Sequence, residues 1–322
     1  MSRSQKRYEF ILQAMQPIAH HAEVFGNAAI AMRRKVRQPD GSWANVPIVT
    51  GDTMRHGLRE ASAYALLDAA GMLDTPTLTE AALRLLFAGG MITGKQDGAV
   101  KLDQYREMVD MMPPLGLLGG CTQNRSIPGR MNVDDALLIC EETRHLWPAW
   151  VTEYMAARTV DTCRAHVEEV QRVRMDPSLT PEKRALLTDG GQAIEKRLGK
   201  LQDATDAIEK QDAKSTMLPR RYETVVAGSI FVWGLTCVCL SDLDVGALNT
   251  MVGAFLSRAV VGGKRATGNG HIRAIEARGV ALTTAKDAAT TALDDAFGVQ
   301  AYRAHVIERA EKIKVWLAKV DS

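Results

Sequence analysis

The hydrophobic and polar positions of the N-terminal part predict short strands and then helices. Three apolar runs predict strands: Phe10 to Ala19, Ala28 to Arg37 and Val46 to Val49. The second of these runs is followed by the turn signal Pro39-Asp40-Gly41. Apolar residues then recur at helical spacing, which predicts helices over Thr53 to Ala70 and Thr79 to Ala88. Asp52 or Thr53 can cap the first helix, and Gly71 ends it.

The middle of the chain changes character twice. Gly116 to Arg130 is rich in Gly, Asn, Ser and Pro and predicts a loop, whereas Met131 to Cys140 predicts a strand or another buried element. Thr152 to Lys214 is polar and charged, and its apolar positions form a heptad-like stripe of Ile194, Leu198, Leu201 and Ile208. This stretch therefore predicts a helical insertion that projects from the core.

The C-terminal part returns to strands. The predicted order is a strand over Val225 to Leu240, a helix over Asp242 to Leu256, a glycine-rich loop over Val260 to Gly270, a strand over His271 to Ala277, and two helices split at Gly298 between Thr283 and Val320. Ser241 or Asp242 can cap the helix that follows the long strand.

This order of elements predicts an α+β fold, a ferredoxin-like core of the RNA-recognition type with a large helical insertion and a helical C-terminal tail. The expected parts are residues 1–150, the first part of the core with loop insertions; 151–220, the helical insertion; 221–280, the second part of the core; and 281–322, the tail.

The composition indicates the cellular compartment and argues against zinc, disulfide and membrane-spanning features. Apolar residues make up 46% of the 322 residues, enough for a full core, and the formal charge of +2 is only mildly basic. The five cysteines form no C-x-x-C pair, so the sequence predicts neither a zinc site nor a disulfide framework. The basic start leads into no sustained apolar region, and glycines interrupt the apolar run from Val225 to Leu240. We therefore expect a cytoplasmic protein without a membrane span.

The first candidate site is the segment from Val46 to Arg59, where a strand ends at Gly51 and a helix follows at once. Arg55 and Arg59 share a helix face beside His56, near the positive end of the helix dipole. Unpaired backbone N–H groups and two guanidinium groups favour a phosphate site. The competing interpretation is that Arg59 pairs with a local carboxylate and Arg55 is solvated.

A second candidate site lies between Gly262 and His271. Four glycines accompany Lys264, Arg265, Asn269 and His271, so the backbone can approach a ligand closely while cations meet a phosphodiester. The spacing matches neither a Walker A motif nor a dinucleotide fingerprint. The competing interpretation is a flexible hairpin loop, which the combination of dense glycines with basic residues disfavours.

Weaker candidates surround these two sites. Gln123, Asn124 and Arg125 offer donors to phosphates and base edges, although a plain surface loop explains them better. Arg33 and Arg34 open a basic run on a predicted strand, usually a solvated face, which here can follow a nucleic-acid backbone. Aromatic residues make up only 5% of the chain, so the composition gives no support for base stacking. No nucleophile elbow, metal-ligand set or cofactor motif occurs, and we expect no catalytic residue, no metal and no cofactor.

The order of these segments resembles a known family. Pro47 to Arg59 resembles the strand–glycine–helix signature of the RAMP superfamily, Gly116 to Ala136 its middle glycine-rich loop, and Tyr222 to His271, with Gly228 to Phe231, its C-terminal half. The chain resembles the Cas-seven backbone subunits of CRISPR effectors over Phe10 to Arg278. The helical insertion and the Arg55-His56 variation are most similar to the type IV version.

The resemblance implies a role and a set of partners. Family members stack along a CRISPR guide RNA, so the expected partners are that RNA, other copies of the chain, other effector subunits, and target nucleic acid through guide pairing. A thumb that crosses the RNA is implied within Arg158 to Arg221. Type III relatives cleave RNA with an acidic residue after the first strand. Here Val24 to Ala28 contains no Asp, although Glu23 lies nearby.

Three hypotheses follow from the sequence. The first is a non-catalytic guide-RNA backbone subunit of a type IV-like effector complex. The second is a RAMP-type endoribonuclease that uses Glu23 or the His20-His21 pair. The third is a protein-interaction scaffold that binds no RNA.

Overall fold

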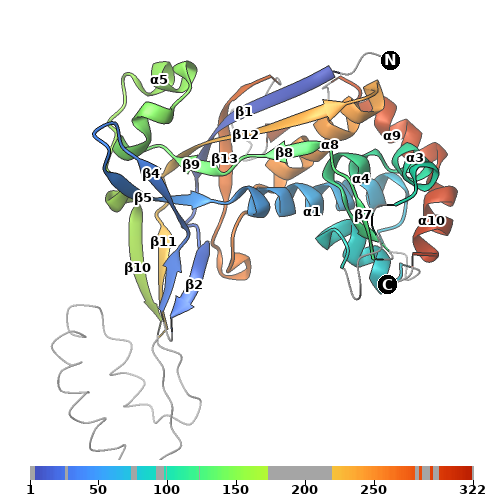
Figure 1. Ribbon diagram of the computed structural model, residues 1–322, viewed down its shortest axis with the longest axis horizontal. Helices are drawn as coiled ribbons and strands as arrows, with labels where there is room; N and C mark the ends of the chain where they lie inside the picture. The colour runs from blue at the N-terminus through green and yellow to red at the C-terminus, as the bar shows by residue number, and fades with distance from the viewer. Residues whose placement is uncertain are drawn as a thin grey trace, which may run out of the picture.

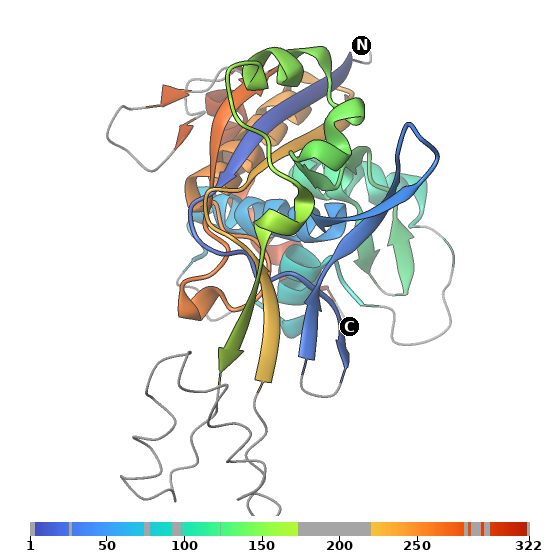
Figure 2. The same cartoon turned by 90° about the vertical axis from the view of Figure 1, so that its left-hand side faces the viewer.

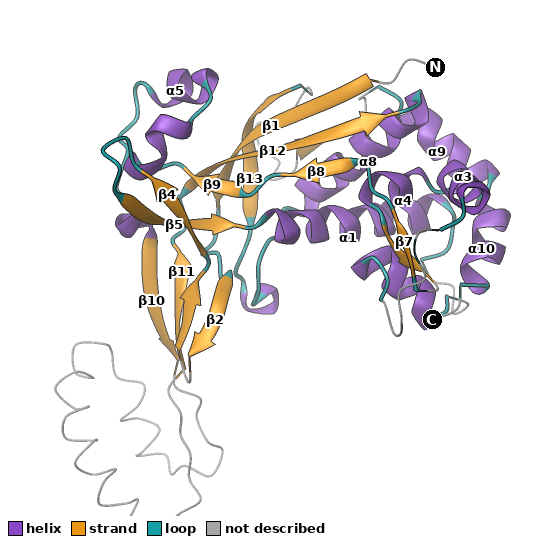
Figure 3. Cartoon of the chain, in the orientation of Figure 1, coloured by secondary structure: helices purple, strands orange, loops and turns teal. Residues whose placement is uncertain are grey.

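The protein is an α+β molecule in which one large sheet organises the rest (Figures 1 and 3), as the sequence predicts. The computed structural model describes residues 4–25, 28–73, 78–91, 98, 100–122, 124–172, 220–279, 283–284, 291–292 and 297–320. None of the helices in this described part is long and apolar enough to cross a membrane.

The main sheet is antiparallel throughout, in the order β13-β1-β12-β9-β5-β4 with β8 beside β12. Its strands are β1 Ser4–Ala14, β4 Arg33–Arg37, β5 Trp43–Val49, β8 Met131–Val133, β9 Ala136–Leu138, β12 Ile230–Cys239 and β13 Ile272–Arg278. The first strand starts earlier than the apolar run at Phe10 predicts, because the polar residues from Ser4 onward already pair with β12. It ends at Ala14, and Ile18 and Ala19 form only isolated bridges.

Each face of the main sheet is covered. Phe10 and Leu12 on β1 point into the larger core, which α1 and α8 cover, whereas Ile11 points into a smaller apolar cluster with Trp150. This is the alternation expected of a strand with two buried faces. Within the larger core the Trp233 ring lies 5.2 Å from that of Phe10, centre to centre.

The helices gather mostly at one end of the molecule (Figure 1). They are α1 Gly51–Ala69, α2 Glu80–Leu83, α3 Leu102–Met111, α4 Pro113–Leu118, α5 Ala149–Met155, α8 Asp242–Arg258, α9 Val299–Glu308 and α10 Ala310–Ala318, with tighter or wider turns at Arg84–Ala88 (η1), Glu141–Leu146 (η2), Cys163–His166 (η3) and Arg265–Thr267 (η4). The predicted cap of α8 at Ser241 is confirmed, since its hydroxyl accepts from the Asp244 amide at 3.2 Å. The cap of α1 is Thr50, rather than Asp52 or Thr53, because the helix begins at Gly51.

A second sheet leads toward the insertion (Figure 2). Its order is β10-β11-β3-β2, formed by β2 His21–Phe25, β3 Ala28–Ala31, β10 Val167–Arg172 and β11 Arg220–Val225. The predicted insertion therefore begins with α5 and strand β10. Its heptad-like stripe and most of the implied thumb fall within 173–219, outside the described residues.

Two local predictions are wrong. The loop predicted over Gly116 to Arg130 contains the end of α4 and a hairpin of β6 Gly120–Thr122 and β7 Arg125–Ile127. In the tail, β14 Thr283–Thr284 pairs with β15 Thr291–Ala292, and both α9 and α10 follow Gly298. Gly298 takes φ +81° and precedes α9 as its cap, so the two tail helices separate at Arg309 instead.

Candidate functional site

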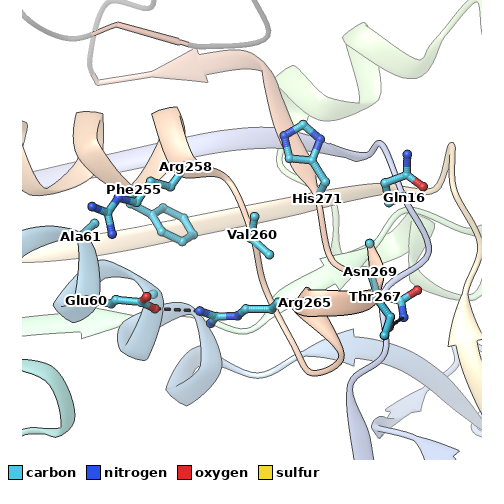
Figure 4. Close-up of a pocket in the computed structure, with 12 residues that line it drawn as sticks. Gln16, Glu60, Ala61, Phe255, Arg258, Val260, Arg265, Thr267, Asn269 and His271 are labelled. Atoms are coloured by element: carbon cyan, nitrogen blue, oxygen red, sulfur yellow. Dashed lines mark hydrogen bonds and ion pairs between the residues drawn. The ribbon is translucent and has the colours of Figure 1, made fainter. Parts of the chain in front are cut away.

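Two adjoining pockets lie beside the N-terminal half of α1. The larger, about 700 Å³, lies between α1, the end of α8 and the loop that leads into β13 (Figure 4). The smaller, about 440 Å³, adjoins the start of α1. The larger is lined by Gln16, Gly57, Glu60, Ala61, Phe255, Arg258, Val260, Arg265, Thr267, Gly268, Asn269 and His271, and the smaller by His20, Asp52, Thr53, His56, Gly262 and Arg265.

Arg265 lines both pockets and ties the loop to the helix. Its Nη1 donates to Glu60 Oε2 at 2.7 Å, and its Nε donates to the Gly262 carbonyl at 3.3 Å (Figure 4). The side chains of Arg265 and Glu60 are 34% and 29% exposed, so the pair is open to solvent and to a competing anion. A guanidinium has further N–H donors beyond these bonds, and it suits bidentate contact with a phosphate.

Glycine allows the close packing that shapes the larger pocket. A Cβ on Gly57 would lie 2.6 Å from the Phe255 ring, so only glycine lets α1 and α8 approach this closely. Gly270 takes φ +88°, and a Cβ there would lie 1.9 Å from the Val261 carbonyl oxygen. Gly270 thus packs against the start of its own loop, and Gly262 packs against Ala19, whereas a Cβ on Gly268 would meet nothing within 4 Å.

The end of α8 supplies apolar and cationic surface. Phe255 packs edge-on against Trp233, with ring centres 5.7 Å apart. The Arg258 guanidinium lies 3.8 Å from the centre of the Tyr64 ring, a cation–π contact between α8 and α1. Sequence analysis missed Gln16, Glu60, Phe255 and Arg258, because nothing in the linear pattern shows that these two helices lie side by side.

The smaller pocket contains an imidazole at the start of α1. The Thr50 amide donates to His20 Nε2 at 3.3 Å, so this nitrogen acts as an acceptor. Burial lowers the pKa of His20, and neighbouring His21 lowers it further, while Asp135 opposes both effects. The ring is therefore neutral near pH 7, and it holds the cap residue of α1 in place.

The start of α1 is already capped within the protein. The Gly51 amide donates to Asp135 Oδ1 at 2.7 Å, and Arg34 Nε donates to Asp135 Oδ2 at 2.9 Å. The Thr53 amide donates to the Thr50 hydroxyl at 3.4 Å. These bonds use backbone N–H groups that the sequence interpretation assigned to a phosphate.

Arg55 and Arg59 face away from the pockets. Arg55 donates to the Met131 carbonyl at 3.1 Å and to the Leu118 carbonyl, and Arg59 donates to the Gly119 carbonyl at 2.9 Å. Arg59 is only 7% exposed, and burial followed by the nearby Arg55 charge lowers its pKa to about 10. Neither the solvated Arg55 nor the carboxylate-paired Arg59 of the competing interpretation is present.

The remaining predicted residues fall into separate groups. His56, Arg265, Asn269 and His271 line the pockets. Beside them, Lys264 Nζ lies 3.1 Å from the centre of the Tyr222 ring.

Other predicted residues lie elsewhere. Arg33 pairs with Glu223 at 2.8 Å, at the base of the second sheet. Asn124 and Arg125 belong to the β6–β7 hairpin, which is bonded to η1 through the Cys121 amide and the Gly89 carbonyl. Gln123 lies outside the described residues. The structure thus brings the second candidate site together with His56, and Asn124 and Arg125 do not line these pockets.

The donor set of the pockets suits an anionic or polar ligand more than a metal. Among the described residues, no group of three or more His, Cys, Asp and Glu side chains could hold a metal ion. All five cysteines are free thiols, and three of them are buried.

The fold belongs to the α+β class, with two helices, α1 and α8, on one face of an antiparallel sheet and a second sheet that leads to an insertion. Among solved structures, it is similar to a chain of a "Type IV-B CRISPR Complex", with a TM-score of 0.53, covering 88% of this chain and 94% of that chain at 15% sequence identity. At this identity the likeness concerns the fold, and at that level the resemblance to the type IV version is confirmed. No protein-family description matches the sequence, and no curated protein matches it.

Proposed function

We propose that this chain is a guide-RNA-binding subunit of a type IV-like CRISPR ribonucleoprotein and that it performs no covalent chemistry. One observation carries the proposal. A fold similar to a chain of a type IV-B CRISPR complex places His56, Arg265, Asn269 and His271 around adjoining pockets.

The chemistry of the pockets suits the backbone of a single RNA strand. Arg265 and the nearby Lys264 supply positive charge for phosphates, and Asn269 and His271 supply donors and acceptors for sugars and phosphates. Glu60 is the acidic side chain bonded to Arg265 and keeps that arginine in place until a phosphate competes for it. Contacts of this kind recognise the RNA backbone, so different guide sequences bind alike.

The proposed core of this subunit is ferredoxin-like. The connection β1–α1–β9–β12–α8–β13 and the strand order β13-β1-β12-β9 support this assignment. Strands β4 and β5 then extend the sheet beyond β9. The pockets lie where the two core helices meet the loop before the last core strand.

The proposed partners follow from the same likeness. The subunit repeats along the guide with other copies of itself, assembles with other effector subunits, and meets target nucleic acid through guide pairing. Supporting this, the solved neighbour is part of a CRISPR complex.

RNA cleavage is a second candidate function, favoured by one specific observation. His20 and His56 line the same pocket as Arg265, and a pair of imidazoles beside a cation can act as general acid and base on a phosphodiester. A labelled-RNA assay without divalent metal separates the two candidates. Cleavage that disappears in His20→Gln and His56→Gln variants favours the endoribonuclease.

Expression with a CRISPR guide tests the main proposal. The purified protein is expected to carry nucleic acid, and sequencing of that RNA is expected to return the guide. An absorbance spectrum of protein alone, obtained at low salt with the guide present, contradicts RNA binding and supports the scaffold hypothesis.

A further inference from the structure

The β4–β5 hairpin presents one face to the core and one to solvent. It extends from one end of the main sheet (Figures 1 and 2), and its register places Lys35 opposite Asn45 and Arg37 opposite Trp43. Because side chains alternate along a strand, these residues share a face, while Val36 on the other face is buried. No residue of the hairpin lines either pocket.

The outward face carries an exposed indole. Trp43 is 63% exposed, whereas the other tryptophans of the chain are buried or partly buried. The Arg37 guanidinium lies 6.0 Å from the centre of the Trp43 ring. The hairpin turn is closed by the Gln38 amide, which donates to the Ser42 carbonyl at 2.9 Å, so the indole stands on an ordered strand pair. Because the Trp43 ring is not packed into the core, it is available to contact a ligand.

The charge of this face is positive. The two strands contain Arg33, Arg34, Lys35 and Arg37 and no acidic residue. Arg33 and Arg34 form ion pairs with Glu223 and Asp135. In the part of the chain that the structure describes, Lys35 and Arg37 form no ion pair.

Two acidic residues on segments that adjoin this face have partners of their own. Asp40 at the hairpin turn accepts bonds from the Ser42 amide at 2.9 Å and the Ser42 hydroxyl at 2.7 Å. On η2, which is bonded to the hairpin through His145 and the Arg37 carbonyl, Glu141 pairs with Arg144 at 2.6 Å. Hydrogen bonds to the neutral Ser42 leave the charge of Asp40 in place. Among the described residues, however, neither Asp40 nor Glu141 forms an ion pair with Lys35 or Arg37.

We propose that the outward face of the β4–β5 hairpin binds single-stranded nucleic acid, with Trp43 stacked on a base and Lys35 and Arg37 at adjacent phosphates. A positive face with one aromatic platform complements a strand that has unpaired bases. The proposal rests on the proposed function and adds to it a second contact surface, separate from the pockets. The low aromatic content of the chain gives no support for base stacking, and the proposal assigns that role to one exposed tryptophan.

The test uses the full-length protein and labelled oligouridine and oligothymidine, followed by fluorescence anisotropy and by intrinsic tryptophan fluorescence. Binding is expected to quench Trp43 fluorescence. Trp43→Ala is expected to lower affinity about tenfold and to remove the quenching, while Trp43→Phe stays within about threefold of wild type, since a phenyl ring still stacks. Lys35→Ala with Arg37→Ala is expected to reduce the salt slope by roughly one unit or slightly more.

Phe297→Ala serves as the matched control, since it removes an aromatic side chain that is 65% exposed in another part of the molecule. Wild-type affinity in Trp43→Ala overturns the proposal, as does an equal loss in Phe297→Ala. If Trp43→Ala binds the oligonucleotides normally but no longer assembles with another subunit, the face is a protein interface, which also overturns it. Copurification of the guide is measured in parallel for the wild type and for Trp43→Ala. If the wild type carries the guide and Trp43→Ala binds the oligonucleotides as wild type does, only this proposal is rejected. If the wild type binds no nucleic acid at all, the proposed function is rejected too.

Discussion

Arg55 and Arg59 differ from the pocket cations in what their guanidinium groups contact. Both donate to backbone carbonyls at the C-terminal end of α4, and Arg55 donates also to Met131 on β8. Nη1 of Arg59 is buried without a hydrogen-bond partner among the described residues. Bonds from a charged donor to a buried carbonyl stabilise a fold by about 1.5–3 kcal/mol each. At the residue scale, therefore, these two arginines stabilise the folded protein.

Replacing both arginines tests this assignment. Arg55→Ala with Arg59→Ala is expected to lower the free energy of unfolding by about 2–4 kcal/mol, because the Leu118 and Gly119 carbonyls lose their donors. Arg265→Ala is the control, since its exposed ion pair with Glu60 is worth about 1 kcal/mol or less. Urea denaturation measures both. If the double variant is as stable as wild type but binds RNA more weakly, the phosphate-binding role predicted from the sequence is correct.

His20 gives the stability of the protein a pH dependence. Its folded-state pKa lies below the ordinary value of 6.5, so the unfolded chain takes up a proton at higher pH than the folded chain. The free energy of unfolding therefore rises with pH between the folded-state pKa of His20 and its ordinary value of 6.5. The stability that neutral His20 contributes is lost as the pH falls below 6.5. His20→Gln keeps an acceptor for the Thr50 amide and removes the titration.

We expect the wild type to lose more stability than His20→Gln between about pH 7.5 and about pH 5.5, by up to about 1 kcal/mol. Burial also lowers the pKa of His166, but His166 is present in both proteins, so the difference isolates His20. Identical pH profiles in urea denaturation would show that His20 does not titrate differently in the folded state.

At the scale of elements, one face of α1 lines the pockets and another face bonds to neighbouring backbone. Thr53, His56 and Glu60 face the pockets, whereas Arg55 and Arg59 face β8 and the end of α4. Residues three and four apart share a helix face, so His56 and Arg55 cannot serve the same ligand from adjacent positions. The packing of α1 against α8 sets the width of the larger pocket.

Gly57→Ala tests that packing. The added methyl group overlaps the Phe255 ring, which costs about 1–3 kcal/mol and exceeds the gain of up to about 1 kcal/mol in helix propensity. We expect a net loss of about 1–2 kcal/mol in urea denaturation, together with a narrower pocket. Adding Phe255→Leu to the Gly57→Ala protein is expected to restore part of the loss. If the Gly57→Ala protein is as stable as wild type, α8 moves to accommodate the methyl group with no loss in the free energy of unfolding.

Elements with strong local signals were predictable from the sequence. Helix α8 follows its Ser241 cap, and β13 follows the glycine-rich loop. Elements defined by long-range pairing were not. The first strand extends back to Ser4 only because β12 offers partners, and Thr283–Thr284 is a strand only because Thr291–Ala292 pairs with it.

The candidate site was predictable only in part, for the same reason. Arg265, Asn269 and His271 occur in one loop, so their residue types and glycine spacing indicate a site without knowledge of the fold. Glu60 and Phe255 join them through the contact between α1 and α8, which no local pattern reveals. The two arginines of α1 were assigned to a phosphate because the sequence does not show the carbonyl groups that accept their bonds.

At the scale of the whole molecule, segments far apart in sequence meet at the pockets. Gln16 follows β1, Glu60 lies on α1, and Arg265 lies on the loop before β13 (Figure 4). We propose that guide RNA lies at these pockets and that the β4–β5 hairpin is a separate contact surface.

Photo-crosslinking of the assembled complex tests whether guide RNA lies at the two pockets. A guide RNA substituted with 4-thiouridine is irradiated in complex with the full-length protein, and crosslinked peptides are identified by mass spectrometry. We expect adducts in residues 50–61 and 255–271, and their loss from the second range in an Arg265→Ala, His271→Ala protein that remains folded. A guide that copurifies but forms adducts in neither range would contradict the assignment of RNA to the pockets.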